Sequence, residues 1–112
     1  MRRGQDAAVP GATMAEVAEV MNQAIRDAGY GDYCHPPYMR VRGHGLGMTS
    51  NLPGDVSAEN PTVLEADMVF AMHPNQYIPE TGYMMCGEPV IVTPQGARAL
   101  STNTATPNRI AL

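Results

Sequence analysis

The apolar residues in the first quarter of the chain follow a helical period. Between positions 14 and 28 they recur at intervals of three and four, which places them on one stripe of a helix: Met14, Val17, Ala18, Met21, Ala24, Ile25 and Ala28. Thr13 and Glu16 have the spacing of a capping box, and Gly29 stands where a left-handed C-cap belongs. The pattern predicts a helix over 14–28, preceded by a helical stub over 2–9.

The remainder of the chain has the pattern of short strands separated by turns. Runs of apolar and β-branched residues predict strands at 39–42, 68–73, 83–86, 89–93 and 97–100. Glycine and proline predict loops at 30–37 and 51–61 and a tight turn at 94–96. One helix followed by antiparallel strands is an α+β pattern. We expect residues 1–112 to form one domain in which an amphipathic helix packs on an antiparallel sheet, with an extended tail over 101–112.

Composition and charge narrow the possible functions. The chain has 112 residues, is 44% hydrophobic and has a net charge of −4, and every basic residue is an arginine. Nucleic-acid binding is not expected, because it needs a concentrated positive face. No apolar run approaches a membrane span, and no signal peptide is evident. We therefore expect a cytoplasmic protein in which Cys34 and Cys86 are free thiols.

Three segments contain residue types that could carry chemistry. Gly43–Met48 holds His44 between glycines, which let the backbone approach another group closely. The strand over 67–75 ends in His73, and the strand over 87–96 begins with Glu88. A histidine between glycines is more often a turn residue than a catalytic one. Each segment alone is therefore weak support for a functional site.

Taken in order, these segments resemble the pita-bread hydrolases: creatinase, aminopeptidase P, prolidase and methionine aminopeptidase. The resemblance lies in Gly-His-Gly-Leu-Gly at 43–47, Met-Val-Phe-Ala-Met-His-Pro at 68–74 and Glu-Pro-Val-Ile-Val-Thr at 88–93. It implies a partial domain, the C-terminal half of a pita-bread fold with its helix on a curved antiparallel sheet. It also implies a hydrolase that cleaves C–N bonds in a short peptide or another small molecule.

The same resemblance implies that the usual metal site is incomplete. His44 matches a family metal ligand, whereas His73 and Gly87 stand where the family has glutamate ligands. Asn51 stands where the family has a second, substrate-binding histidine, and the two aspartate ligands would precede this chain. A dinuclear hydrolytic centre needs bridging carboxylates. We therefore expect no metal and no other cofactor.

Three hypotheses follow. The first is a metal-independent, creatinase-like hydrolase in which His44 and His73 act as general acid and base, with Glu88 or Asn51 orienting the substrate. The second is a non-catalytic binding module or pseudoenzyme. The third is a rebuilt zinc or iron site of His44, His73 and Glu88. Under all three, the isolated chain is expected to be inactive. It is also expected to form a homodimer or to associate with the missing N-terminal half.

Overall fold

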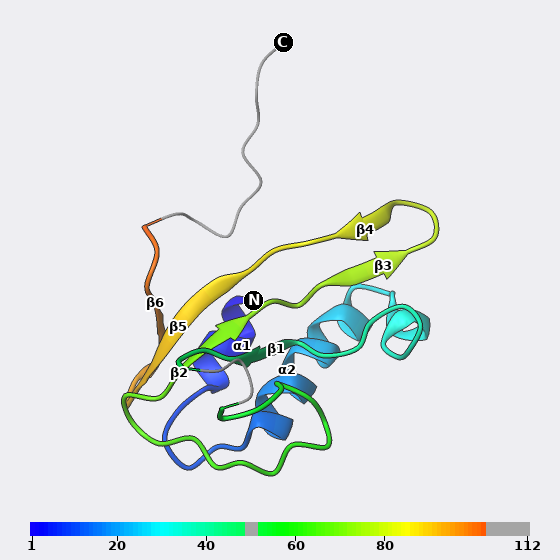
Figure 1. Cartoon of the computed structure of the whole chain (residues 1–112). Coiled ribbons are helices and arrows are strands. Elements are labelled where there is room, and N and C mark those ends of the chain that lie inside the picture. Colours follow the sequence, from blue (N-terminus) through cyan, green and yellow to red (C-terminus); the bar gives the residue numbers. More distant parts are fainter. Residues whose placement is uncertain (49–51, 103–112) are drawn as a thin grey trace.

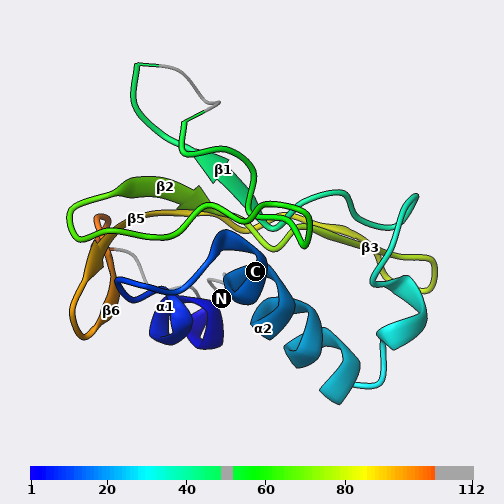
Figure 2. The same cartoon turned by 90° about the horizontal axis from the view of Figure 1, so that it is seen from below.

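Two helices cover one face of an antiparallel sheet. The computed structural model describes residues 1–48 and 52–102. Helix α1 (Arg2–Ala7) and helix α2 (Met14–Asp27) lie together beneath the strands, and Figure 2 shows both on the same side. The opposite side of the sheet has no helix among the described residues (Figures 1 and 2). The expected α+β class is confirmed.

Helix α2 begins as its sequence predicts. The Thr13 hydroxyl oxygen accepts a hydrogen bond from the backbone N–H of Glu16 at 3.1 Å. The Glu16 carboxylate in turn accepts one from the Thr13 backbone N–H at 2.7 Å, which completes the capping box. At the other end the chain leaves the helix through Gly29, which has a φ of +87°. Both ends of the helix are therefore set by local sequence.

The main sheet has four antiparallel strands in the order β1-β2-β5-β6. Their bounds are Gly43–Gly45 (β1), Val69–Met72 (β2), Glu88–Thr93 (β5) and Gly96–Ala99 (β6). Strands β3 (Gln76–Ile78) and β4 (Gly82–Met84) form a separate hairpin. A short 3₁₀ helix, η1 (Gly31–Tyr33), lies in the predicted loop after α2. Four of the five predicted strands correspond to strands of the structure, namely β2, β4, β5 and β6.

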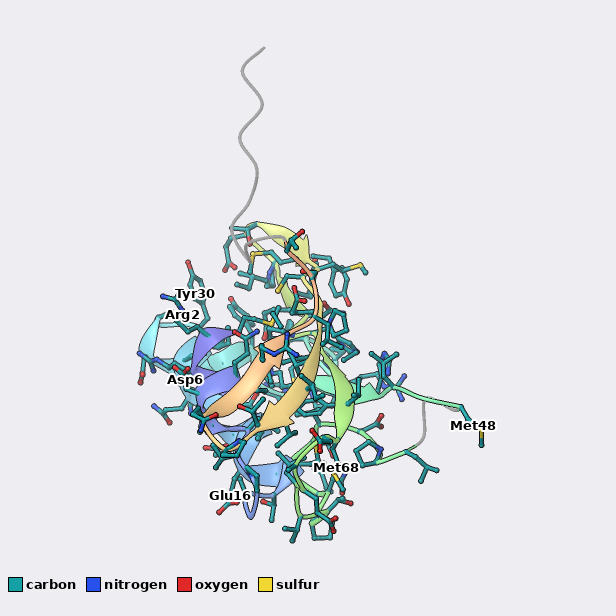
Figure 3. The ribbon with its side chains drawn as sticks, turned by 90° about the vertical axis from the view of Figure 1, so that its left-hand side faces the viewer. Arg2, Asp6, Glu16, Tyr30, Met48 and Met68 are labelled. Carbon is teal, nitrogen blue, oxygen red and sulfur yellow. The ribbon has the colours of Figure 1, made fainter. Side chains whose placement is uncertain are left out.

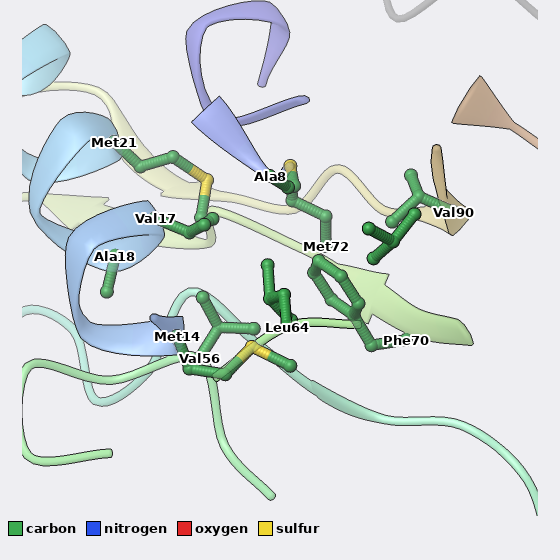
Figure 4. Close-up of a cluster of buried hydrophobic side chains, with 11 residues drawn as sticks. Ala8, Met14, Val17, Ala18, Met21, Val56, Leu64, Phe70, Met72 and Val90 are labelled. Atoms are coloured by element: carbon green, nitrogen blue, oxygen red, sulfur yellow. The ribbon is translucent and has the colours of Figure 1, made fainter. Parts of the chain in front are cut away.

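Buried apolar residues at alternate positions of β2 and β5 form the sheet side of the core. Phe70 and Met72 of β2 are fully buried, and so are Val90 and Val92 of β5. These side chains meet the apolar stripe of α2, and Figure 4 shows the resulting cluster: Ala8, Met14, Val17, Ala18, Met21, Val56, Leu64, Phe70, Met72, Val90 and Val92. Because successive strand residues point to opposite faces, the residues between these core positions belong to the open face of the sheet. We use that name for the face of His44 and Ala71.

Two strand predictions need correction. The strand expected at 39–42 is wrong, because regular pairing begins at Gly43. Arg42 is fully buried there, whereas Met39 and Val41 are only half-buried. The burial is thus the reverse of what is expected for a strand with its apolar residues inside. Strand β3 was not predicted, because its buried positions include the polar Gln76.

The structure leaves some expectations open. The expected tail over 101–112 falls outside the described residues from position 103 onward. No helix in the described part of the chain is long and apolar enough to cross a membrane.

Met48 is fully exposed, and Figure 3 shows it projecting from the body of the molecule on the loop that follows β1.

Candidate functional site

His44 is held by close backbone packing on both sides. A Cβ added to Gly43 would lie 2.1 Å from the carbonyl oxygen of Ala71, and one added to Gly45 would lie 2.0 Å from that of Leu52. Neither position has room for a side chain, so both must be glycine at this backbone spacing. The predicted close approach is thereby confirmed. The flanking glycines place His44 between two neighbouring backbone segments.

The structure brings His44 and His73 together. His44 pairs in register with Ala71 of β2, and His73 follows two residues later on the same face. The centroids of the two imidazole rings are 4.8 Å apart and their planes are tilted by 56°. The backbone N–H of His73 donates to the carbonyl oxygen of Arg42 at 2.9 Å, which ties the end of β2 to the segment leading into β1. The pair is therefore fixed by backbone hydrogen bonds on both strands.

The two imidazoles have different environments. His44 Nδ1 lies 2.8 Å from the carbonyl oxygen of Gly45, and since a carbonyl only accepts, Nδ1 carries the proton of that bond. His73 Nδ1 is buried and has no hydrogen-bond partner among the described residues. Burial lowers the pKa of His73, and the neighbouring His44 lowers it further. Burial therefore favours neutral His73, whose buried Nδ1 is left without a partner by the described residues.

An acidic residue that the sequence did not single out lies beside this pair. Asp55 forms an isolated antiparallel bridge with His44, and its charge opposes the lowering of the His73 pKa. Asp55 and His73 line one cavity of about 400 Å³, together with Asn75, Arg40, Tyr38 and Tyr83. Asp55 follows Pro53-Gly54 in a predicted loop, and no local pattern indicates that this loop folds back on β1. The cavity gives His73, but not His44, a substrate-sized space lined by charges of both signs.

Glu88 does not join the histidines. It pairs in register with Met72, and paired residues of an antiparallel sheet share a face. Glu88 is 6% exposed on the helix-covered face, where its two oxygens accept hydrogen bonds from the Ser101 backbone N–H at 2.9 Å and the Ser101 hydroxyl at 2.7 Å. Gly87, one residue earlier, is the position next to His73. A shift of one residue thus moves the carboxylate to the other face.

The fold and the arrangement on the open face together define the class of protein. The chain has part of a pita-bread fold, with a Gly-His-Gly strand that places His44 on the open face. A model of metallopeptidase family M24 matches residues 1–94, and the chain belongs to this family.

Known relatives agree with this assignment. The chain is 33% identical over 100 residues to the Xaa-Pro dipeptidase of Pyrococcus furiosus, a match that covers 89% of this chain and 28% of the relative. It is 34% identical over 96 residues to a putative dipeptidase of Bacillus subtilis, covering 86% of this chain and 25% of that protein. The chain thus spans little more than a quarter of the curated relatives it matches.

Solved structures give the same result for the fold. The prolidase from Pyrococcus furiosus superposes with a TM-score of 0.79 at 32% identity, over 92% of this chain and 29% of that one. The X-Pro aminopeptidase from Thermotoga maritima gives a TM-score of 0.80 at 26% identity, over 94% of this chain and 29% of that one. The expected resemblance to part of a pita-bread hydrolase is confirmed.

The described residues do not by themselves supply the carboxylates of the metal centre that the family name implies. Two bound cations held close together need bridging carboxylates. Among residues 1–48 and 52–102, no group of three or more His, Cys, Asp or Glu side chains is placed to hold a metal ion. Gly87, beside His73, has no donor side chain, and Glu88 faces away. The expected substrate contact of Asn51 lies outside the described residues.

Proposed function

We propose that this chain forms the histidine-bearing wall of a hydrolase site for C–N bonds in Xaa-Pro dipeptides or related small amides, and that this wall works without a metal of its own. The observation that carries the proposal is the pair of His44 and His73 rings, 4.8 Å apart on the open face. An imidazole pair of this kind can pass a proton to or from a bound substrate. Family membership suggests the reaction, hydrolysis of a C–N bond, and the histidine pair offers groups for proton transfer.

In this proposal the two histidines have separate roles. His73, which lines the adjoining cavity, accepts a proton or a hydrogen bond from the substrate through its ring. His44, whose Nδ1 is already bonded to Gly45, presents its other nitrogen, Nε2. Asp55 and Arg40 of the adjoining cavity can contact the amino and carboxylate ends of a short peptide. Glu88 is left out of the catalytic group, because it lies on the other face.

One observation favours a second candidate, a non-catalytic peptide-binding module. Gly87 offers no side chain where the pita-bread hydrolases, by the motif resemblance, carry a glutamate. A protein that kept the cavity but lost the acidic groups would bind peptides without cleaving them. Both candidates place the ligand against His44 and His73.

Binding and turnover together test the metal-free binding site that both candidates share. We expect Ala-Pro, more than the matched dipeptide Ala-Ala, to shift the imidazole NMR signals of His44 and His73, with the same shifts in excess EDTA. We also expect no hydrolysis by the chain alone. Dipeptide cleavage that stops on adding EDTA would show that these residues hold a working metal and would contradict the proposal. Unchanged histidine signals would contradict both candidates.

We further propose that the chain associates with a second copy of itself through the open face and the β3–β4 hairpin. Large apolar side chains are exposed in the loop after β1, at Leu52 (71%), and in and just after β4, at Tyr83 (60%) and Met85 (75%). Exposed apolar surface of this kind drives association, and two-fold dimers are the commonest result. Light scattering at micromolar concentration should give the mass of a dimer. A monomer mass with cooperative unfolding would exclude this association.

A further inference from the structure

Arg42 is a buried arginine that stands behind the cavity of His73 rather than in it. Its side chain is fully buried, and it is not among the residues that line the cavity of about 400 Å³. None of the ion pairs among residues 1–48 and 52–102 includes Arg42. A buried charge without an opposite charge costs free energy, and an apolar side chain of similar size is often at least as stable in its place. The use of an arginine here is therefore explained by what its guanidinium holds.

The guanidinium joins segments that are distant in sequence. Nε donates to the side-chain oxygen of Asn22 in α2 at 2.6 Å. Nη1 donates to the carbonyl oxygen of Asn75 at 3.0 Å, and Nη2 donates to the side-chain oxygen of Gln76 at 3.0 Å. The planar fork of an arginine can direct donors to all three acceptors at once, which the ammonium group of a lysine cannot do. One side chain thus ties the helix to the turn between β2 and β3.

The Nη1 bond acts on the part of the cavity lining that carries His73. Asn75 lines the cavity with His73, and its backbone N–H donates to the His73 carbonyl oxygen at 2.6 Å. The backbone carbonyl oxygen of Arg42 itself accepts the His73 N–H at 2.9 Å. Arg42 therefore holds the segment 73–75 at two points, through its backbone and through its side chain. His44 follows Arg42 by two residues, so the same contacts fix where the two imidazoles meet.

The Nη2 bond reaches another part of the cavity lining through Gln76. Gln76 is also fully buried, and its Nε2 donates to the carbonyl oxygen of Tyr33 at 2.8 Å. The backbone N–H of the next residue, Tyr77, donates to the carbonyl oxygen of Tyr38 at 2.9 Å. Tyr38 lines the cavity, and its ring packs edge-on against that of Tyr33 with the ring centroids 4.9 Å apart. The loop that carries Tyr38 is thus fastened to the same guanidinium.

We propose that Arg42 is a positioning residue for the candidate site, and that its fork of donors sets the spacing between His73 and the loop of Tyr38. Since the guanidinium is fully buried, it acts through these two segments and touches no ligand. This role rests on the proposed function only for the ligand, because the spacing is a property of the free chain. Any buried cation could supply a charge at this position, whereas the positioning role needs the three-way fork.

Arg42→Lys separates the fork from the charge, because it keeps a cation at the same position. The matched control is Asn22→Ala, which removes only the Nε acceptor on the helix side and leaves both bonds toward the cavity. NMR of the 112-residue chain measures the exchange rate of the His73 backbone amide, relative to the core amides of α2, and the nuclear Overhauser effect between the His44 and His73 rings. In Arg42→Lys we expect the His73 amide to exchange about tenfold faster and the ring contact to weaken. Asn22→Ala should change neither.

Ligand binding gives a second readout. Ala-Pro should bind to Arg42→Lys several-fold more weakly than to the original chain, and it should bind to Asn22→Ala with unchanged affinity. If Ala-Pro binds to none of the three proteins, the proposed function fails. The amide exchange and the ring contact then still decide the role of Arg42, because both are measured without a ligand.

Two results would overturn the proposal. One is a His73 amide rate and a ring contact in Arg42→Lys that match those of the original chain. The other is an equal change in Asn22→Ala, which would show a general loosening. If Arg42→Lys does not fold, as checked by circular dichroism, the original chain decides. A guanidinium held by three acceptors should give separate, slowly exchanging N–H signals, unlike the exposed Arg2, and averaged signals from Arg42 would contradict the proposal.

Discussion

The Cβ that Gly87 lacks would lie 3.5 Å from the Cβ of His73. That distance is an ordinary van der Waals contact, and Gly87 is not among the glycines with a left-handed backbone. A side chain could therefore occupy this position without moving its neighbours. By the motif resemblance, the pita-bread hydrolases carry glutamates at the positions of His73 and Gly87. The backbone of the site is thus retained, while its carboxylates are replaced.

This relationship makes the metal chemistry testable by substitution. The double variant His73→Glu/Gly87→Glu would place two carboxylates beside His44 on one face of the sheet, which is a ligand set suited to a divalent cation. We expect it to bind about one Mn²⁺ or Co²⁺ per chain in a calorimetric titration. The matched control, His73→Glu/Glu88→Gln, alters the other face instead and should bind none. Equal binding by both variants would show that position 87 does not belong to the site.

Gly45 should tolerate no side chain. Gly45→Ala would drive its Cβ into the backbone of Leu52, so we expect a loss of about 1–3 kcal/mol in the free energy of unfolding. Gly47→Ala is the control, because a Cβ there meets nothing within 4 Å. Denaturant midpoints measure both. A Gly45→Ala variant as stable as Gly47→Ala would mean that the loop after β1 does not pack on His44.

The helix cap gives a second stability prediction. Thr13→Ala removes the oxygen that accepts the Glu16 N–H, and it should lower the free energy of unfolding by about 1 kcal/mol. Thr13→Ser keeps that oxygen and should be close to the original in stability. Chemical denaturation compares the three proteins. Equal loss in both variants would point to the threonine methyl group rather than to the cap.

The same cap predicts that the stability of the chain depends on pH through the Glu16 carboxylate. Hydrogen bonds from the Thr13 backbone and hydroxyl hold the pKa of Glu16 below its ordinary value of 4.5. Its stabilising contribution is therefore complete above pH 4.5 and is lost as the pH falls through the lowered pKa. We expect the original chain to be more stable than Glu16→Gln at pH 7, and the two to converge in acid. A constant difference between pH 7 and pH 3 would contradict this account.

The sequence predicts what depends on neighbouring residues. The capping box, the helix stripe and the alternation of β2 and β5 are local, and each appears in the structure as expected. The buried Arg42 could not be predicted, because its partners Asn22, Asn75 and Gln76 come from three distant segments. Those partners accept hydrogen bonds from the guanidinium, and this allows an arginine to be buried at this position.

The candidate site was predictable to the same extent. The order of motifs indicated His44 and His73, and the pairing of β1 with β2 brings them together. Glu88 was chosen for its residue type, but the pleat of the strand turns it toward Ser101. Asp55 was missed because its position depends on a loop that returns to β1 from a distance in sequence. Residue types alone do not show on which face of the sheet a side chain lies, and that face decides which residues come together.

The central proposal is that the residues of this chain keep the histidine of the M24 site but do not hold its metal. Elemental analysis of the purified chain, after dialysis against a mixture of zinc, manganese, cobalt and iron salts, tests it most directly. We predict no stoichiometric metal in the original chain and the same result for His44→Ala. One or more ions per chain, lost on His44→Ala, would contradict the claim.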